Sequence, residues 1–88
     1  MNKEEVMRVL TKEVGTSFYD CQSSNLVCYG YRAEDKSLWI VFKGNKVYQY
    51  TPLERVQFEE LQAAESKGKW VNANLVKSKV NYKVYEIV

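Results

Sequence analysis

The sequence of 88 residues contains no histidine, one proline, four glycines and two cysteines. Without histidine, the usual Ser-His-Asp and Cys-His arrangements, imidazole acid-base catalysis and most transition-metal sites lose a central residue. The two cysteines, Cys21 and Cys28, are too few for the disulfide framework of a small secreted protein, and their spacing fits no common zinc pattern. We therefore expect a protein that is not an enzyme and that holds no metal and no cofactor.

Long hydrophobic runs are also missing. No segment approaches the roughly 18 apolar residues of a membrane span, and the N-terminal MNKEEVMRVL lacks the apolar stretch of a signal peptide. The low content of proline and glycine, with 45% hydrophobic and 27% charged residues, excludes collagen-like and low-complexity chains. The sequence predicts a cytoplasmic protein with no membrane contact, folded as a single domain over residues 1–88.

Charge is distributed unevenly along the chain. Residues 1–65 carry a net charge of −2, whereas residues 66–85 carry five lysines and no acidic residue. A basic segment of this kind is a candidate surface for an anionic partner.

The N-terminal half predicts one helix followed by strands. Apolar residues at helical spacing over 3–14, with Gly15 just beyond, indicate a helix that ends at the glycine. Residues 16–24 are polar and turn-prone, which is typical of a connector. From residue 25 the period changes to that of strands, over 25–31, 38–43 and 46–50, joined by a polar turn and a Gly-Asn turn.

The second half predicts a helix and a last strand. Thr51, Pro52 and Glu54 form a typical helix start, and Gly68 is the expected stop. The final KVNYKVYEIV reads as a fourth strand, placed at a sheet edge or paired with the first strand. The expected fold is α+β: a small, mostly antiparallel four-stranded sheet with one helix packed on a face and an additional N-terminal helix over residues 1–15.

Several segments together resemble a known family. They are SSNL, the following GY, then LWIVFKGNKVYQYTPL and AAESKGKWVNANL. In order and spacing this is similar to the KTSC domain, a short module found alone in bacterial and phage proteins and at the C-terminus of some lysyl-tRNA synthetases. The resemblance covers residues 23–85 and places the family motif on Tyr48, Tyr50, Ser66 and Gly68. It implies a non-catalytic binding module from a bacterium or a phage, with a role in RNA binding suggested by the attachment to a synthetase.

The basic segment is the best candidate for RNA binding. Its lysines are interleaved with an aromatic residue and amides that could stack and hydrogen-bond, and the candidate residues are Lys67, Lys69, Trp70, Asn72, Lys77, Lys79 and Lys83. Lysines at a loop and an edge strand also serve solubility and prevent edge-to-edge aggregation, so both interpretations are open. Tyr48 and Tyr50 are likewise either core residues or a stacking platform for bases.

A rival function belongs to a different class. Both faces of the second strand are apolar, so Trp39 and Val41, with Val47 of the next strand, could bind a protein partner or a second copy of the chain. The alternative is that the N-terminal helix covers this face with Val6, Met7, Leu10 and Val14.

A polar pocket is expected after the second helix. If Gly68 adopts a positive φ, the chain reverses there and turns Trp70 back toward the sheet. That reversal would bring Ser66, Asn72 and Asn74 near the hydroxyl groups of Tyr48 and Tyr50.

Overall fold

A computed structural model describes residues 2–87 of the protein. The elements in chain order are α1 (Lys3–Val14), β1 (Phe18–Asp20), β2 (Leu26–Arg32), β3 (Ser37–Phe42), β4 (Lys46–Tyr50), α2 (Arg55–Ala63), α3 (Lys67–Val71), the π-helical turn η1 (Asn72–Val76) and β5 (Tyr82–Glu86).

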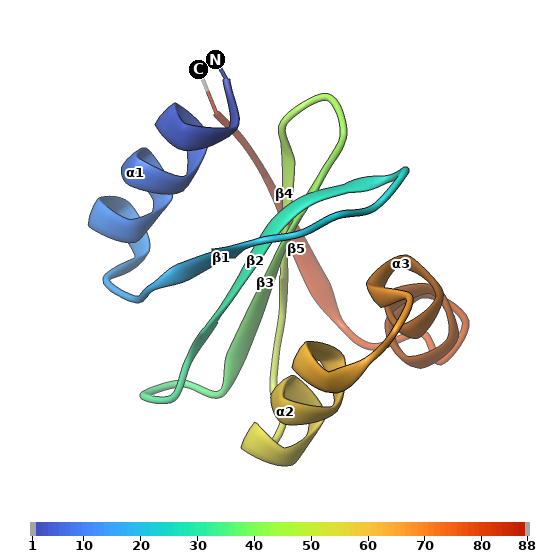
Figure 1. Cartoon of the computed structure of the whole chain (residues 1–88). Helices are drawn as coiled ribbons and strands as arrows, with labels where there is room; N and C mark the ends of the chain where they lie inside the picture. The colour runs from blue at the N-terminus through green and yellow to red at the C-terminus, as the bar shows by residue number, and fades with distance from the viewer. Residues whose placement is uncertain (1, 88) are drawn as a thin grey trace.

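The sheet has five antiparallel strands that lie side by side in chain order, β1-β2-β3-β4-β5 (Figure 1). The α+β class and the antiparallel meander are confirmed, but the expected number of strands was four. The additional strand is β1, in the segment predicted to be a connector, where Tyr19 pairs with Tyr29 of β2. A three-residue strand with one buried side chain leaves no detectable period-two pattern. The last strand pairs with β4 at the sheet edge, and not with the first strand.

Helices cover both faces of the sheet, with α1 on one side and α2, α3 and η1 on the other (Figure 1). The predicted N-terminal helix is confirmed with its bounds. Asn2 caps its start by accepting a hydrogen bond from the Glu5 N–H at 2.9 Å. Gly15 ends it at φ 81°, in the left-handed region that glycine adopts without steric cost.

The face beneath α1 is a closed core. Val6, Leu10 and Val14 of the helix pack in one cluster with the outer apolar residues of the sheet, Trp39, Val41 and Val47. Trp39 is 7% exposed, and the two valines are fully buried. The prediction that these three residues form an exposed interface patch is therefore wrong, and the alternative of a helical cover is confirmed. The Trp39 indole N–H donates to the buried Ser37 hydroxyl at 2.9 Å, which satisfies its one polar group.

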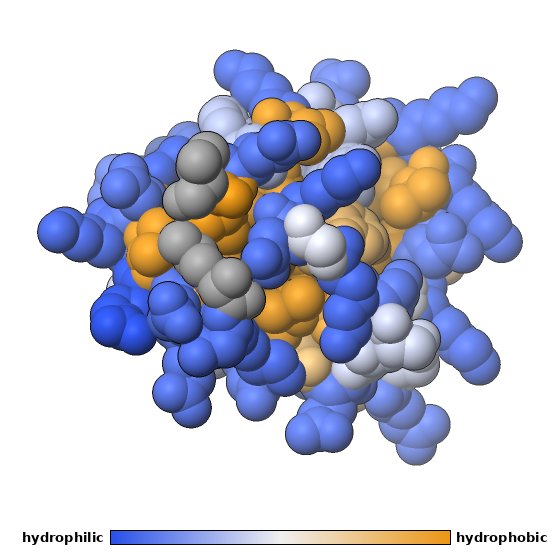
Figure 2. All heavy atoms as spheres, turned by 90° about the horizontal axis from the view of Figure 1, so that it is seen from above, coloured by the Kyte–Doolittle hydropathy of each residue, from blue (hydrophilic) through white to orange (hydrophobic). Residues whose placement is uncertain are grey.

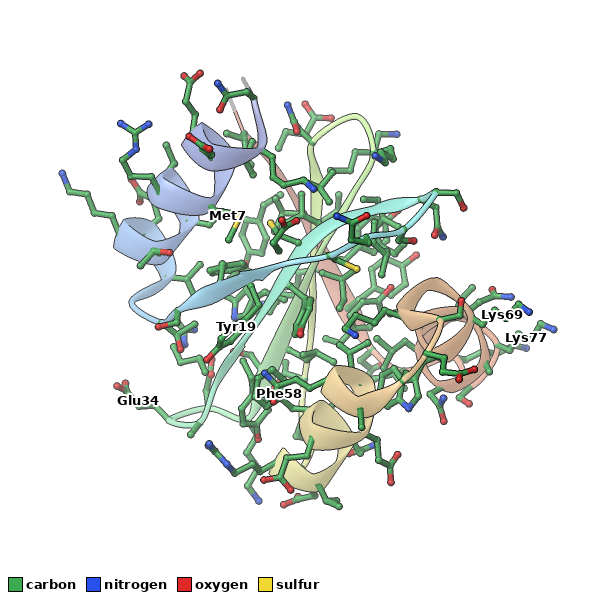
Figure 3. All side chains as sticks on the ribbon, in the orientation of Figure 1. Met7, Tyr19, Glu34, Phe58, Lys69 and Lys77 are labelled. Atoms are coloured by element: carbon green, nitrogen blue, oxygen red, sulfur yellow. The ribbon has the colours of Figure 1, made fainter. Side chains whose placement is uncertain are left out.

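The second helix starts and ends at positions other than those predicted. The Thr51–Pro52 peptide bond is cis, and α2 begins at Arg55 with Glu54 as the N-cap. The Glu54 N–H donates to the Gln57 side chain at 2.8 Å, so the capping box lies three residues later than expected. Figure 3 shows Phe58 of α2 directed toward the sheet, where its ring stacks on Tyr31 with centroids 5.2 Å apart.

The prediction that Gly68 stops this helix is also wrong. The helix ends at Ala63, and a separate short helix, α3, follows with Gly68 inside it. Ser66 begins α3 by accepting a hydrogen bond from the Lys69 N–H at 3.3 Å. Gly68 does not have a positive φ, so its role does not depend on a left-handed conformation.

Among residues 2–87, no helix combines the length and the apolar character that crossing a bilayer requires. Within the same residues, no three His, Cys, Asp or Glu side chains gather where they could hold a metal ion. Seen from the end where the chain begins and ends, the surface is largely hydrophilic, with hydrophobic atoms in separate patches (Figure 2).

Candidate nucleic-acid interface

The five lysines of the predicted basic surface do not all lie on one exposed surface of the structure. Lys69 and Lys77 are exposed and extend outward from the α3–η1 unit (Figure 3), and Lys79 follows in the exposed turn after it. Lys83 pairs with Gln49 in the β4–β5 ladder and so lies on the face of the sheet that α1 covers. Lys67 is half-buried, and its ammonium group donates to the Ala64 carbonyl oxygen at 3.3 Å. Three of the five lysines thus remain together and available to a partner.

The two other predicted contact residues differ in position. Trp70 is half-buried and packs against the core between the sheet and α2, so it is not an open stacking platform. Its carbonyl oxygen accepts a hydrogen bond from the Asn74 side chain at 2.9 Å, which ties α3 to η1. Asn72 is exposed and faces a polar hollow.

That polar hollow joins two distant segments of the chain. It lies between the loop before β2 and the start of α3, and its lining includes Ser23, Asn25, Ser66, Gly68 and Asn72. The Ser23 hydroxyl donates to the Asn25 side chain at 2.8 Å. Ser66, Gly68 and Asn72 of the expected polar pocket therefore line one hollow, whereas Asn74 does not and instead donates to the Trp70 carbonyl oxygen.

The expected partners of that pocket were wrong, because the loop of residues 22–25 faces it in place of Tyr48 and Tyr50. Those tyrosines belong to a second hollow on the same side of the sheet. We call it the aromatic groove; it has a volume of about 640 Å³ and is lined by Phe42, Lys46, Tyr48, Tyr50, Leu75, Val76, Lys79, Val80, Asn81 and Tyr82.

Tyr48 and Tyr50 play unequal parts in this groove. Tyr50 is 2% exposed and belongs to the core, whereas Tyr48 is half-buried. The ring of Tyr82, which is 56% exposed, stacks on Tyr48 with centroids 5.0 Å apart. Tyr50 is thus a packing residue, whereas Tyr48 lies at the edge of an accessible aromatic surface.

Lys46 and Tyr82 complete the groove, and neither was among the predicted site residues. They come from β4 and β5, which are more than thirty residues apart in sequence but adjacent in the sheet. The signal that could have found them is the alternation of Lys46, Tyr48 and Tyr50 in one strand, since residues two apart share a face.

The cysteines are structural. Cys21 and Cys28 are both free and buried, in the cores on opposite faces of the sheet. Burial raises the pKa of the Cys28 thiol to about 12, so this thiol stays protonated at neutral pH and is a poor nucleophile.

The fold defines the chain as a small α+β domain whose antiparallel meander carries two hollows on the side of its short C-terminal helices. The chain belongs to the KTSC domain family, because the model of that domain matches residues 22–78, well over half of the sequence. The match leaves out α1, β1 and β5.

A solved structure has the same fold. The crystal structure of a KTSC domain protein from Yersinia pestis superposes with a TM-score of 0.67 at 23% sequence identity, covering 83% of this chain and 99% of the other. No curated protein matches the sequence.

Proposed function

We propose that this domain is a non-catalytic, cytoplasmic binding module for RNA and that it contacts the phosphate backbone through the α3–η1 unit. The observation that carries the proposal is the group of exposed lysines Lys69, Lys77 and Lys79, in a stretch of 20 residues that has no acidic side chain. Lysine recognises phosphates as a point charge and does not read base edges in a bidentate manner, so the expected binding has little base specificity.

The test is a titration of the protein with fluorescent single-stranded RNA and with tRNA at several salt concentrations. For a single strand, each phosphate that a lysine neutralises contributes about 0.7 to the slope of log Kobs against log salt. Lys69→Gln with Lys77→Gln should therefore reduce the magnitude of the slope by about 1.4 and weaken binding at every sequence.

A matched control is available on the opposite face. Arg8 and Lys12 are exposed residues of α1, so Arg8→Gln with Lys12→Gln removes the same net charge from a surface that the proposal does not use. The control variant should retain most of the affinity. Absence of salt-sensitive binding by the wild type at micromolar concentration would overturn the proposal.

One observation favours a second candidate, self-association through β5. All five residues of this edge strand are exposed, and Tyr82, Val84 and Tyr85 are 56%, 49% and 44% exposed. Exposed strand edges pair readily with other chains, although Lys83 in the same strand opposes this. Light scattering across a concentration series tests this candidate. Pairing through β5 predicts a dimer that Val84→Lys dissociates. The control is Val56→Lys, at a 57% exposed site on α2, which should leave the dimer intact. A monomer at all concentrations rejects it.

A further inference from the structure

The aromatic groove is lined mainly by aromatic and aliphatic side chains. Four aromatic side chains from three neighbouring strands lie along its floor, namely Phe42, Tyr48, Tyr50 and Tyr82. Tyr48 stacks on Tyr82 at 5.0 Å and on Tyr50 at 6.0 Å, while Phe42 meets Tyr48 edge-on at 5.0 Å. The rest of the apolar lining is aliphatic and comes from Leu75, Val76 and Val80. A lining of aromatic and aliphatic side chains suits a planar aromatic ligand.

The groove also offers hydrogen-bonding groups to a polar ligand. Tyr50 is 98% buried, and in the part of the chain that the structure describes its hydroxyl makes no hydrogen bond to protein. Among the described residues, every side-chain oxygen or nitrogen that is fully buried has a hydrogen-bond partner. Because the Tyr50 hydroxyl oxygen has none, it is not fully buried and can be reached from outside. By contrast, the Tyr31 hydroxyl, in the core beneath α2, donates to the Leu53 carbonyl oxygen at 2.7 Å. Asn81 is a further polar residue of the lining.

The Tyr50 hydroxyl is neutral at physiological pH, as tyrosine ordinarily is, and burial moves its pKa further from that range. Desolvation, with the neighbouring Tyr48 and Tyr82, raises the pKa of Tyr50 to about 12. At neutral pH this group is therefore a hydrogen-bond donor as well as an acceptor.

The charges at the rim favour an anion. Lys46 and Lys79 line the groove and no acidic side chain does. The nearest acid in the sheet is Glu86, which pairs with Lys46 across β4 and β5 but makes no ion pair with it among the described residues. A ligand with one flat ring and one anionic group matches this arrangement better than a wholly apolar ligand or an uncharged peptide.

We propose that the aromatic groove binds a single nucleobase, stacked on the exposed ring of Tyr82 beside Tyr48, with the attached phosphate held by Lys46 and Lys79. The volume of about 640 Å³ lies within the range of about 300–1,000 Å³ that is usual for small-molecule sites. The inference rests on the proposed function in so far as the nucleotide belongs to RNA. The same chemistry is presented by a free nucleoside monophosphate, and the experiment separates the two sources.

The experiment observes ligand at the groove directly. Methyl NMR signals of Val76 and Val80, which line it, are followed during titration with adenosine and uridine monophosphates, then with a short single-stranded RNA. Each unphosphorylated nucleoside serves as the ligand control and should bind more weakly, since it lacks the group that the lysines hold. Signals that do not move at millimolar monophosphate and with the RNA would overturn the inference.

Variants test the stacking and the charge separately. Tyr82→Leu keeps an apolar side chain but removes the ring, and should weaken binding about ten-fold. Tyr85→Leu is the control, because Tyr85 lies in the same strand on the opposite face, where its ring packs at a tilt against Trp39 with centroids 5.5 Å apart. Lys79→Gln should reduce the preference for the monophosphate over the nucleoside, since Lys46 remains, and Glu86→Gln should strengthen binding of the monophosphate, since it removes the negative charge of the residue that pairs with Lys46 across the strands. Equal binding by the Tyr82 and Tyr85 variants would reject the stacking role.

The result also distinguishes this inference from the proposed function. Binding of RNA that depends on Lys69 and Lys77 but is insensitive to Tyr82→Leu refutes the nucleobase site and leaves the RNA surface in place. Binding of free monophosphates that Tyr82→Leu weakens, without binding of RNA, supports the nucleobase site and refutes the RNA surface.

Discussion

Gly68 of α3 lies against the side chain of Asn25 so closely that a Cβ atom at residue 68 would be 2.5 Å from the Asn25 Oδ1 and 3.1 Å from the Ser23 Oγ. Real Cβ atoms do not approach other atoms to 2.5 Å. The contact joins the SSNL segment before β2 to the Ser66-Lys67-Gly68 segment of α3, two of the stretches on which the family resemblance depends.

The Gly68→Ala substitution should change the free energy of unfolding less favourably in the wild type than in an Asn25→Ala background. Alanine stabilises a helix interior relative to glycine by about 0.5–1 kcal/mol, and this gain should appear only when the Asn25 side chain is absent. A double-mutant cycle by urea unfolding should show a coupling of about 1 kcal/mol between the two positions. Additive effects within about 0.3 kcal/mol would show that Asn25 moves aside freely.

Leu10→Ala should destabilise the protein by about 2–3 kcal/mol, because Leu10 is 6% exposed and fills the core between α1 and the sheet. Urea unfolding measures the loss. Arg8→Ala, at an exposed position of the same helix, is the control and should change stability by less than about 0.5 kcal/mol. A Leu10→Ala variant as stable as the control would mean that α1 does not hold the Trp39 face closed in solution.

Ser37→Ala should cost about 1–3 kcal/mol, since it leaves the indole N–H of the buried Trp39 without its acceptor. Thermal melting compared with Ser17→Ala, at an exposed serine, checks this. A loss no larger than that of the control would show that the indole finds another acceptor.

Asp35 should make stability depend on acid pH. The pKa of Asp35 falls from 3.8 to about 2, mainly because Arg32 donates hydrogen bonds to its carboxylate at 2.7 Å and 3.1 Å, with a smaller contribution from the hydrogen bond of the Ser37 hydroxyl. A carboxylate whose pKa is lowered by folding stabilises the folded state above its unfolded pKa and loses that contribution as the pH falls through the folded value. The wild type should therefore be more stable than Asp35→Asn from about pH 5 upward, and the difference should disappear between about pH 4 and pH 2.

Melting curves across this pH range measure the effect. The Asp35 side chain is 42% exposed, so solvent screening keeps the difference small. Glu34→Gln makes the same charge change at the neighbouring residue without removing the Arg32 pair. A gap between wild type and Asp35→Asn that is independent of pH would contradict the assignment.

Local sequence patterns were sufficient to predict the elements that end at a characteristic capping or turn residue. The apolar stripe of α1 ends at Gly15, and the β3–β4 turn has Gly44 and Asn45 at positive φ, as a Gly-Asn turn favours. The start of α2 was predicted too early. Pro52 is a good first helical residue in general, whereas here Glu54 and Gln57 form the capping box. Gly68 suggested a helix stop because glycine is enriched just after helix ends, whereas in the structure it lies inside α3, which Ser66 begins.

The candidate site depended on contacts between distant segments. The sequence placed lysines at 67, 69, 77, 79 and 83 in one basic segment, yet strand alternation puts Lys83 on the other face of the sheet. The pairing of β4 with β5 brings Tyr82 onto Tyr48, and no local pattern contains that pairing.

By itself, the sequence determined the family, the α+β class, the meander and the unusual apolar character of both faces of β3. These properties follow from residue order, periodicity and turn chemistry, all of which act over a few neighbouring positions. Only the tertiary structure decided that α1 covers Trp39, that Gly68 is held close to Asn25, and that the aromatic groove exists. Burial and side-chain contact depend on which surfaces meet when the chain closes on itself, and residues far apart in the sequence supply those surfaces.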